Sequence, residues 1–200
     1  MIYGTTCDGG RYYSGIAFSL AQISSKWTFT VLYNFDGGPH GGCPASALAK
    51  GKNGNLIGTT YYGGDPNCAC GTVYELSHGA SGWTETVLHK FLGSPNDGAS
   101  PEMAVVSDAK GNLFGATQEG GTNEDGTVYK IPIASGGKYG AEIVLGSQGN
   151  ETTGYQPDGD RLAIDKNGNL YGTAENGGTN DAGMVFEAVN SAGSYSLTAF

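Results

Sequence analysis

The four cysteines have the most distinctive chemistry in this 200-residue chain. Four cysteines allow three disulfide pairings, but Cys68 and Cys70 are too close in sequence for an unstrained bond. We therefore predict that Cys43 pairs with Cys68 or Cys70, which leaves the other for Cys7. A zinc site of His40, Cys43, Cys68 and Cys70 has suitable ligand types, although the Cys-x-Cys spacing is unusual for zinc. Buried free thiols are the third alternative.

Tyrosines beside acids and amides form a second chemical group, which suits stacking on a sugar and hydrogen bonding to its hydroxyls. The candidate ligand-binding residues are Tyr12, Tyr13, Asp36, Tyr61, Tyr62, Asp65, Asn123, Asp125, Asn180 and Asp181. The tyrosines could equally cap the packing between neighbouring units. Loop oxygens at 120–126 and 177–181 could bind Ca²⁺, but they lack the alternating ligands of a dedicated calcium loop.

No catalytic residue is predicted. A glycoside hydrolase needs two carboxylates that face the scissile bond, and the acids of this chain lie in no recognisable catalytic motif. The three histidines occupy unrelated positions in the sequence pattern. A non-enzymatic binding protein is therefore the first hypothesis. A hydrolase or lyase that uses loop carboxylates and a structural spacer without a ligand are the alternatives.

Charge and hydropathy exclude several classes of partner. The chain has 10 Lys and Arg against 19 Asp and Glu, a net charge of −9. Nucleic acids and anionic membranes attract clusters of basic residues, so neither is an expected partner. The apolar stretches are too short for a membrane span, and the residues after Met1 do not resemble a signal peptide.

An internal repeat positions these residues. The segment at 3–6, Tyr-Gly-Thr-Thr, returns in related form at 57–60, 114–117 and 171–174, at spacings of 54, 57 and 57 residues. A pair of glycines, a short apolar segment and a second segment opened by an aromatic residue follow each copy. These aromatic residues are Trp27, Trp83, Tyr139 and Tyr195.

Each repeat predicts four short strands, which in the second copy are 45–50, 55–60, 72–76 and 83–91, because β-branched and aromatic runs alternate with Gly, Asn and Asp. Such a unit buries its faces only against neighbours. We predict an all-β fold, a β-propeller-like array of four-stranded antiparallel blades with 3.5–4 repeats; an open solenoid is the alternative. The residues expected to be mostly buried are Val73, Leu76, Val87, Phe91, Val128, Ile131, Val144 and Val185.

The motifs carry a resemblance to a known family. Gly-Asn-Leu-Tyr-Gly-Thr, a glycine pair, Gly-Thr-Val-Tyr and Trp-x-Glu-Thr-Val-Leu resemble the GloVer tandem repeat of bacterial surface or exported proteins. The resemblance covers nearly the whole chain. It implies a propeller-like, extracellular or cell-surface protein without enzymatic activity, and it transfers no catalytic residue.

The repeats predict one domain, 1–200, with blades at 2–35, 44–91, 101–147 and 157–200. The first blade lacks one strand. The chain is thus expected to be either a piece of a larger propeller or a four-bladed ring with one three-stranded blade. Unpaired strand edges would favour self-association through the terminal blades.

Antiparallel connections alternate between two faces, so the long loops share one face. Arg11 is the only Lys or Arg in those loops, whereas the short turns opposite hold lysines, including Lys52. This acidic face either attracts a ligand or merely solvates the loops. Its acids are Asp8, Asp36, Asp65, Asp97, Glu119, Glu124, Asp125, Glu151, Glu175 and Asp181.

Overall fold

The computed structural model describes residues 1–51, 54–134, 136–149 and 153–199, whose named elements are all β-strands. The first sheet has three strands, and each later main sheet has four antiparallel strands. The strands in sheet order are β1 (Ile2–Thr6), β2 (Ile16–Ile23) and β3 (Lys26–Asn34); β4 (Ala49–Lys50), β5 (Leu56–Thr60), β6 (Thr72–Gly79) and β7 (Gly82–Lys90); β9 (Val106–Ser107), β10 (Leu113–Thr117), β12 (Thr127–Ile131) and β13 (Ile143–Ser147); and β14 (Tyr155–Ile164), β15 (Leu170–Asn176), β16 (Met184–Ser191) and β17 (Ser194–Ala199). A small sheet pairs β8 (Gly98–Ala99) with β11 (Glu119–Gly120).

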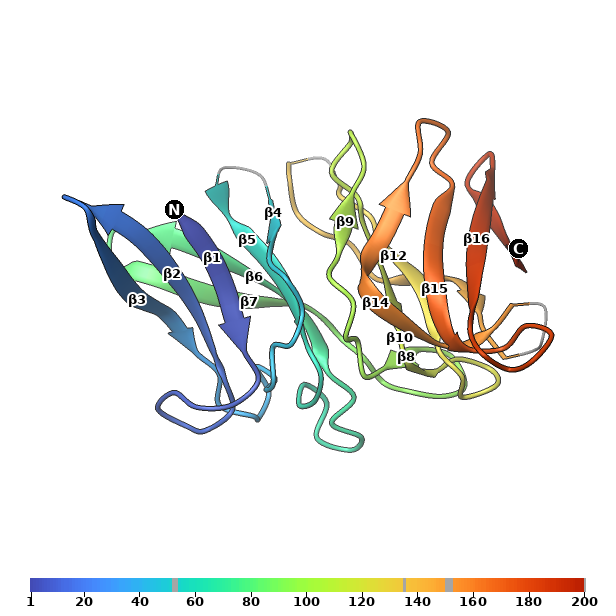
Figure 1. Cartoon of the computed structure of the whole chain (residues 1–200), viewed down its shortest axis with the longest axis horizontal. Coiled ribbons are helices and arrows are strands. Elements are labelled where there is room, and N and C mark those ends of the chain that lie inside the picture. Colours follow the sequence, from blue (N-terminus) through green and yellow to red (C-terminus); the bar gives the residue numbers. More distant parts are fainter. Residues whose placement is uncertain (52–53, 135, 150–152, 200) are drawn as a thin grey trace.

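The four main sheets follow one another in a row, and the first and last lie at opposite ends of the molecule (Figure 1). Over the described ranges this is an open array of small antiparallel sheets and no closed propeller. The expected strand at 45–50 is shortened to β4, two residues long. The segment before β4 forms other hydrogen bonds instead. The Ser46 carbonyl accepts a hydrogen bond from the Thr5 hydroxyl at 2.9 Å, and the Ser46 hydroxyl lies 2.8 Å from the Thr59 hydroxyl.

The Gly-Thr motif has a steric cause. In each main sheet a glycine of one strand pairs with an aromatic residue of the next, and the ring crosses over the glycine. A Cβ atom on Gly58 would lie 2.6 Å from Cζ of Tyr74, and one on Gly115 would lie 2.5 Å from Cζ of Tyr129. Gly4 and Gly172 pair with Phe18 and Phe186 in the same way.

Three hydrophobic cores lie between consecutive sheets rather than within them. The core between the second and third sheets contains Val73, Phe91, Leu113, Tyr129 and Ile131, all fully buried. The strand pairs β2–β3, β6–β7 and β12–β13 each have a register shift at the same position. Such a bulge re-aims a side chain, and the leucine it leaves without a cross-strand partner packs against the core: Leu32, Leu88 and Leu145.

The burial predictions hold for Val73, Leu76, Phe91, Val128 and Ile131, which are fully buried. Val87 and Val144 are only partly buried. The expectation for Val185 is wrong, because its exposed fraction is 46%. It occupies the position of Val73 and Val128 in the last sheet, and no described strand follows to cover it.

A glycine and a proline join consecutive repeats. The residue before the proline donates its N–H to the carbonyl of the preceding repeat: Cys43 to Ser14 at 2.9 Å, Ser100 to Cys70 at 2.9 Å and Gln156 to Asp125 at 2.8 Å. The next glycine of that repeat lies under the proline ring. A Cβ atom on Gly15, Gly71 or Gly126 would lie 2.6 Å from Cδ of Pro44, Pro101 or Pro157. We call this contact the Gly–Pro junction.

Candidate functional site

The long loops gather along one edge of the array and the short hairpins along the other (Figure 1). The hairpins have a structural explanation, because the Asp108 carboxylate accepts the backbone N–H groups of Lys110 and Asn112 at 2.9 Å each. Asp165 repeats this pattern in the last sheet. These carboxylates thus serve the turns, whereas the predicted ligand-binding residues lie in the long loops. Two residues assigned to these faces from the sequence, Glu151 and Lys52, lie outside the described residues.

All four cysteines form disulfides, but the predicted pairing is wrong. Cys7 bonds to Cys43 and Cys68 bonds to Cys70. Cys43 joins the loop of the preceding repeat, where its N–H is bound by Ser14, and this places it beside Cys7. The exclusion of the Cys68–Cys70 bond also fails: Ala69 has a φ of 54°, and the two Cα atoms are 5.2 Å apart, within the range usual for disulfides.

These two bonds remove the zinc alternative, because all three cysteine ligands of the proposed set are oxidised. Disulfides persist in oxidising environments and are rare in the cytosol, so they are typical of an extracellular setting. Within the described ranges the structure contains no helix with the length and apolar character that a membrane crossing requires.

A cleft of about 330 Å³ opens on the long-loop face at the first sheet. We call it the Tyr12 cleft; its lining residues are Arg11, Tyr12, Leu32, Tyr33, Asn34, Asp36 and His40. Two of the predicted ligand-binding residues, Tyr12 and Asp36, therefore lie in it. Tyr12 is 48% exposed, and the Arg11 guanidinium lies 5.4 Å from the centroid of its ring.

The polar groups of the Tyr12 cleft are held in place by neighbouring residues. The Asn34 side-chain oxygen accepts the Arg11 backbone N–H at 2.8 Å, and Asp36 accepts the N–H of Gly38 at 2.9 Å. Burial, with Glu85 and Asp36 nearby, raises the pKa of Tyr33 to about 12. The Tyr33 hydroxyl therefore keeps its proton at neutral pH and remains a donor.

Glu85 contacts His40, one of the residues that line the Tyr12 cleft. Its side chain is 1% exposed, and its Oε2 atom lies 2.7 Å from Nδ1 of the half-exposed His40. Its other oxygen, Oε1, is buried and has no hydrogen-bond partner among the described residues. Because Nδ1 of His40 is engaged by Glu85, the Nε2 atom is the ring nitrogen that remains to meet a ligand.

Glu85 should make stability depend on pH. Burial raises the pKa of its carboxyl group and Asp36 adds to this, whereas the hydrogen bond and charge of His40 and the charge of Lys90 oppose it. The native state thus binds a proton more tightly than the unfolded chain, so the free energy of unfolding falls as pH rises above the ordinary glutamate value. Glu85→Gln is neutral throughout and should make this fall shallower in urea titrations between about pH 4 and pH 8. Parallel curves for the two proteins would contradict this assignment.

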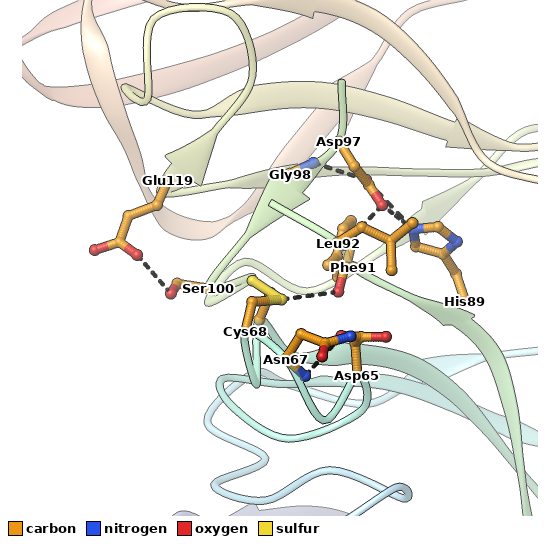
Figure 2. The surroundings of a disulfide bond; sticks show 11 residues. Asp65, Asn67, Cys68, His89, Phe91, Leu92, Asp97, Gly98, Ser100 and Glu119 are labelled. Carbon is orange, nitrogen blue, oxygen red and sulfur yellow. Dashed lines mark hydrogen bonds and ion pairs between the residues drawn. A yellow bond between two sulfur atoms is a disulfide. The ribbon is translucent and has the colours of Figure 1, made fainter. Parts of the chain in front are cut away.

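A second cleft of about 470 Å³ lies beside the Cys68–Cys70 bond. Its lining includes Leu92, Glu119, Glu124 and Gln156. Figure 2 shows Cys68 next to the carbonyl of Phe91, with a sulfur-to-oxygen distance of 3.6 Å, and Glu119 bound to the Ser100 hydroxyl at 3.0 Å. No predicted ligand-binding residue lines this cleft.

Several predicted residues have structural roles instead. Asp65 accepts the N–H and amide of Asn67, and Asn123 donates to the Gln148 carbonyl at 2.8 Å. Asp181 accepts the N–H of Gly177 at 2.8 Å. Asp65 also lines a third cleft of about 500 Å³ between residues 37–39 and 63–69.

The remaining candidates are dispersed. Tyr13 is 83% exposed and lines none of these three clefts. Tyr61 and Tyr62 are partly buried and bond through their backbones to Cys43 and Gly42. Asp125 is likewise bound through its carbonyl at the Gly–Pro junction, and Asn180 is exposed.

Two glutamates with buried carboxylate oxygens, Glu85 and Glu142, were not predicted from the sequence. Glu85 and Glu142 occupy equivalent positions, two residues before Val87 and Val144, which pair with Tyr74 and Tyr129. The corresponding positions in the first and last sheets are Phe29 and Leu197, next to Phe18 and Phe186. A tyrosine in one strand therefore accompanies a glutamate in the next, and a phenylalanine accompanies an apolar residue. This co-variation between repeats was a usable signal.

The sequence model of the Gloeobacter/Verrucomicrobia repeat matches residues 1–200, the whole chain. No curated protein matches the chain. The match covers all four main sheets and names no ligand.

Proposed function

Because the chain belongs to the Gloeobacter/Verrucomicrobia repeat family, we propose that it is an extracellular or cell-surface repeat protein that binds carbohydrate without chemical turnover, through its long-loop face. The array holds the Tyr12 cleft in this face, and the two disulfides support a location outside the cytosol. The observation that carries the proposal is the exposed Tyr12 ring beside fixed polar groups.

The chemistry of the Tyr12 cleft suits a polar, uncharged ligand. It combines one guanidinium, one carboxylate, one amide, one imidazole and the two phenol rings of Tyr12 and Tyr33. These groups supply both donors and acceptors, as neighbouring sugar hydroxyls require. The ring of Tyr12 offers an apolar face for the C–H side of a sugar.

The proposal is tested with a glycan array, followed by calorimetric titration of the best oligosaccharide. Tyr12→Ala is expected to weaken binding roughly tenfold or more, because it removes the stacking ring. Tyr13→Ala is the matched control: Tyr13 is the next residue, is more exposed and lies outside the cleft. It should bind as the wild type does.

Two outcomes would overturn the proposal. If no glycan binds, or if Tyr12→Ala and Tyr13→Ala bind equally well, the Tyr12 cleft is not a carbohydrate site, and a structural spacer becomes the better account. The second outcome is that the protein releases reducing ends from the bound glycan and that Asp36→Asn abolishes this release. The function would then be glycan hydrolysis and not binding alone.

A further inference from the structure

Three potential metal ligands meet beneath the loops between the second and third sheets. Ligand atoms of His89, Asp97 and Glu142 all lie within 4.8 Å of one another. His89 lies in β7, Asp97 precedes β8, and Glu142 directly precedes β13. Two consecutive repeats therefore contribute to one cluster, which is distinct from the Tyr12 cleft.

Two members of the cluster, Asp97 and His89, are held in place by neighbouring groups. Figure 2 shows the Asp97 carboxylate between the His89 ring and the backbone of Leu92 and Gly98. The carboxylate accepts the N–H of Leu92 at 2.9 Å and that of Gly98 at 2.7 Å, and its Oδ2 atom is 3.0 Å from Nε2 of His89. The His89 ring packs edge-on against Phe91, with centroids 4.7 Å apart. Donor atoms fixed in this way lose little freedom when they bind an ion.

The cluster holds two carboxylates and one imidazole. The Oε1 atom of Glu142 is buried and has no hydrogen-bond partner among the described residues. The carboxylate of Asp97, which is also largely buried, lies beside Glu142. In the preceding repeat the equivalent glutamate, Glu85, lies in hydrogen-bond contact with His40. Two carboxylates that share a desolvated site with one imidazole are favoured by a bound cation.

We infer that His89, Asp97 and Glu142 form a binding site for a divalent transition-metal ion that links the second and third repeats. One imidazole nitrogen and two carboxylate oxygens are the ligand set that Zn²⁺, Mn²⁺ and Co²⁺ accept, with water completing the coordination. The ion takes the place of the hydrogen bond between Nε2 of His89 and Asp97, and the neutral imidazole then carries its proton on Nδ1. The two carboxylate charges balance those of the ion.

The experiment is a calorimetric titration of the full chain, freed of metal by a chelator and dialysis, with Zn²⁺, Mn²⁺ or Co²⁺ as the ligand. The Co²⁺ titration is repeated in visible absorption, where coordinated ions give ligand-field bands. Glu142→Gln is expected to weaken binding at least tenfold. Glu85→Gln, the same change at the equivalent position of the preceding repeat, is expected to leave binding unchanged.

Thermal melts of the metal-free proteins establish that both variants fold, and His89→Gln replaces Glu142→Gln if that variant does not. Metal should raise the melting temperature of the wild type and of Glu85→Gln only, because an ion that binds the native state alone stabilises it. The inference is overturned if the wild type binds none of the three ions, or if Glu142→Gln binds them as tightly as the wild type.

Discussion

Gly126→Ala is expected to lower the free energy of unfolding by about 3 kcal/mol or more, through backbone strain and overpacking together. Gly126 has a φ of +104°, and an added Cβ atom would lie 2.6 Å from Cδ of Pro157 and closer still to the Thr117 carbonyl oxygen. Both neighbours belong to rigid backbone or ring, so the third and fourth repeats would have to separate. Urea unfolding of the two proteins measures the difference.

Gly82→Ala separates the two causes. Gly82 has nearly the same φ, +107°, but an added Cβ atom would meet nothing within 4 Å. The free energy of unfolding of this variant should fall only by the cost of the left-handed backbone conformation, about 1 kcal/mol. If the two alanine variants lose equal stability, the Gly–Pro junction does not hold the repeats together.

Removal of the Cys7–Cys43 bond should have an effect of similar size. The bond spans 36 residues and joins the first loop to the segment that enters the second sheet. In the chain-entropy model, a crosslink of this span stabilises the native state by about 4 kcal/mol. The double variant Cys7→Ser and Cys43→Ser is therefore expected to unfold at a markedly lower urea concentration.

The second disulfide is the internal control. Cys68 and Cys70 are two residues apart, so their bond restricts the unfolded chain much less. The double variant Cys68→Ser and Cys70→Ser should lose clearly less stability. Equal losses, or no loss in the Cys7 and Cys43 variant, would contradict the assigned connectivity or its role.

The repeat could be predicted because local rules determine it. The Gly-Thr segments fix where an aromatic ring crosses a strand, and the Asp-x-x-Gly-Asn turns close hairpins at Asp108 and Asp165 through bonds within a few residues. The strand expected at 45–50 failed for a non-local reason, because Ser46 bonds to Thr5 and Thr59 instead of extending a ladder. The exposure of Val185 likewise depends on what packs above it.

The site was only partly predictable. Tyr12 and Asp36 share a cleft because two loops of one repeat meet. The Cys7–Cys43 bond, by contrast, depends on a contact between repeats, because Cys43 reaches the preceding repeat through its bond to Ser14. The burial of the glutamates was not predictable for a related reason. In a strand of alternating polar and apolar residues, a glutamate is expected to face solvent unless a neighbouring repeat covers it. Only comparison of Glu85 and Glu142 with Phe29 and Leu197 reveals the pattern.

Hydrogen–deuterium exchange, with and without a saturating oligosaccharide from the array, tests most directly whether the long-loop face is the binding face. Binding at the Tyr12 cleft should slow exchange in residues 7–14 and 34–41, which line or flank the cleft, and leave the hairpins at 108–112 and 165–169 unchanged. If exchange slows at those hairpins and stays unchanged in the loops, the long-loop face is not the binding face.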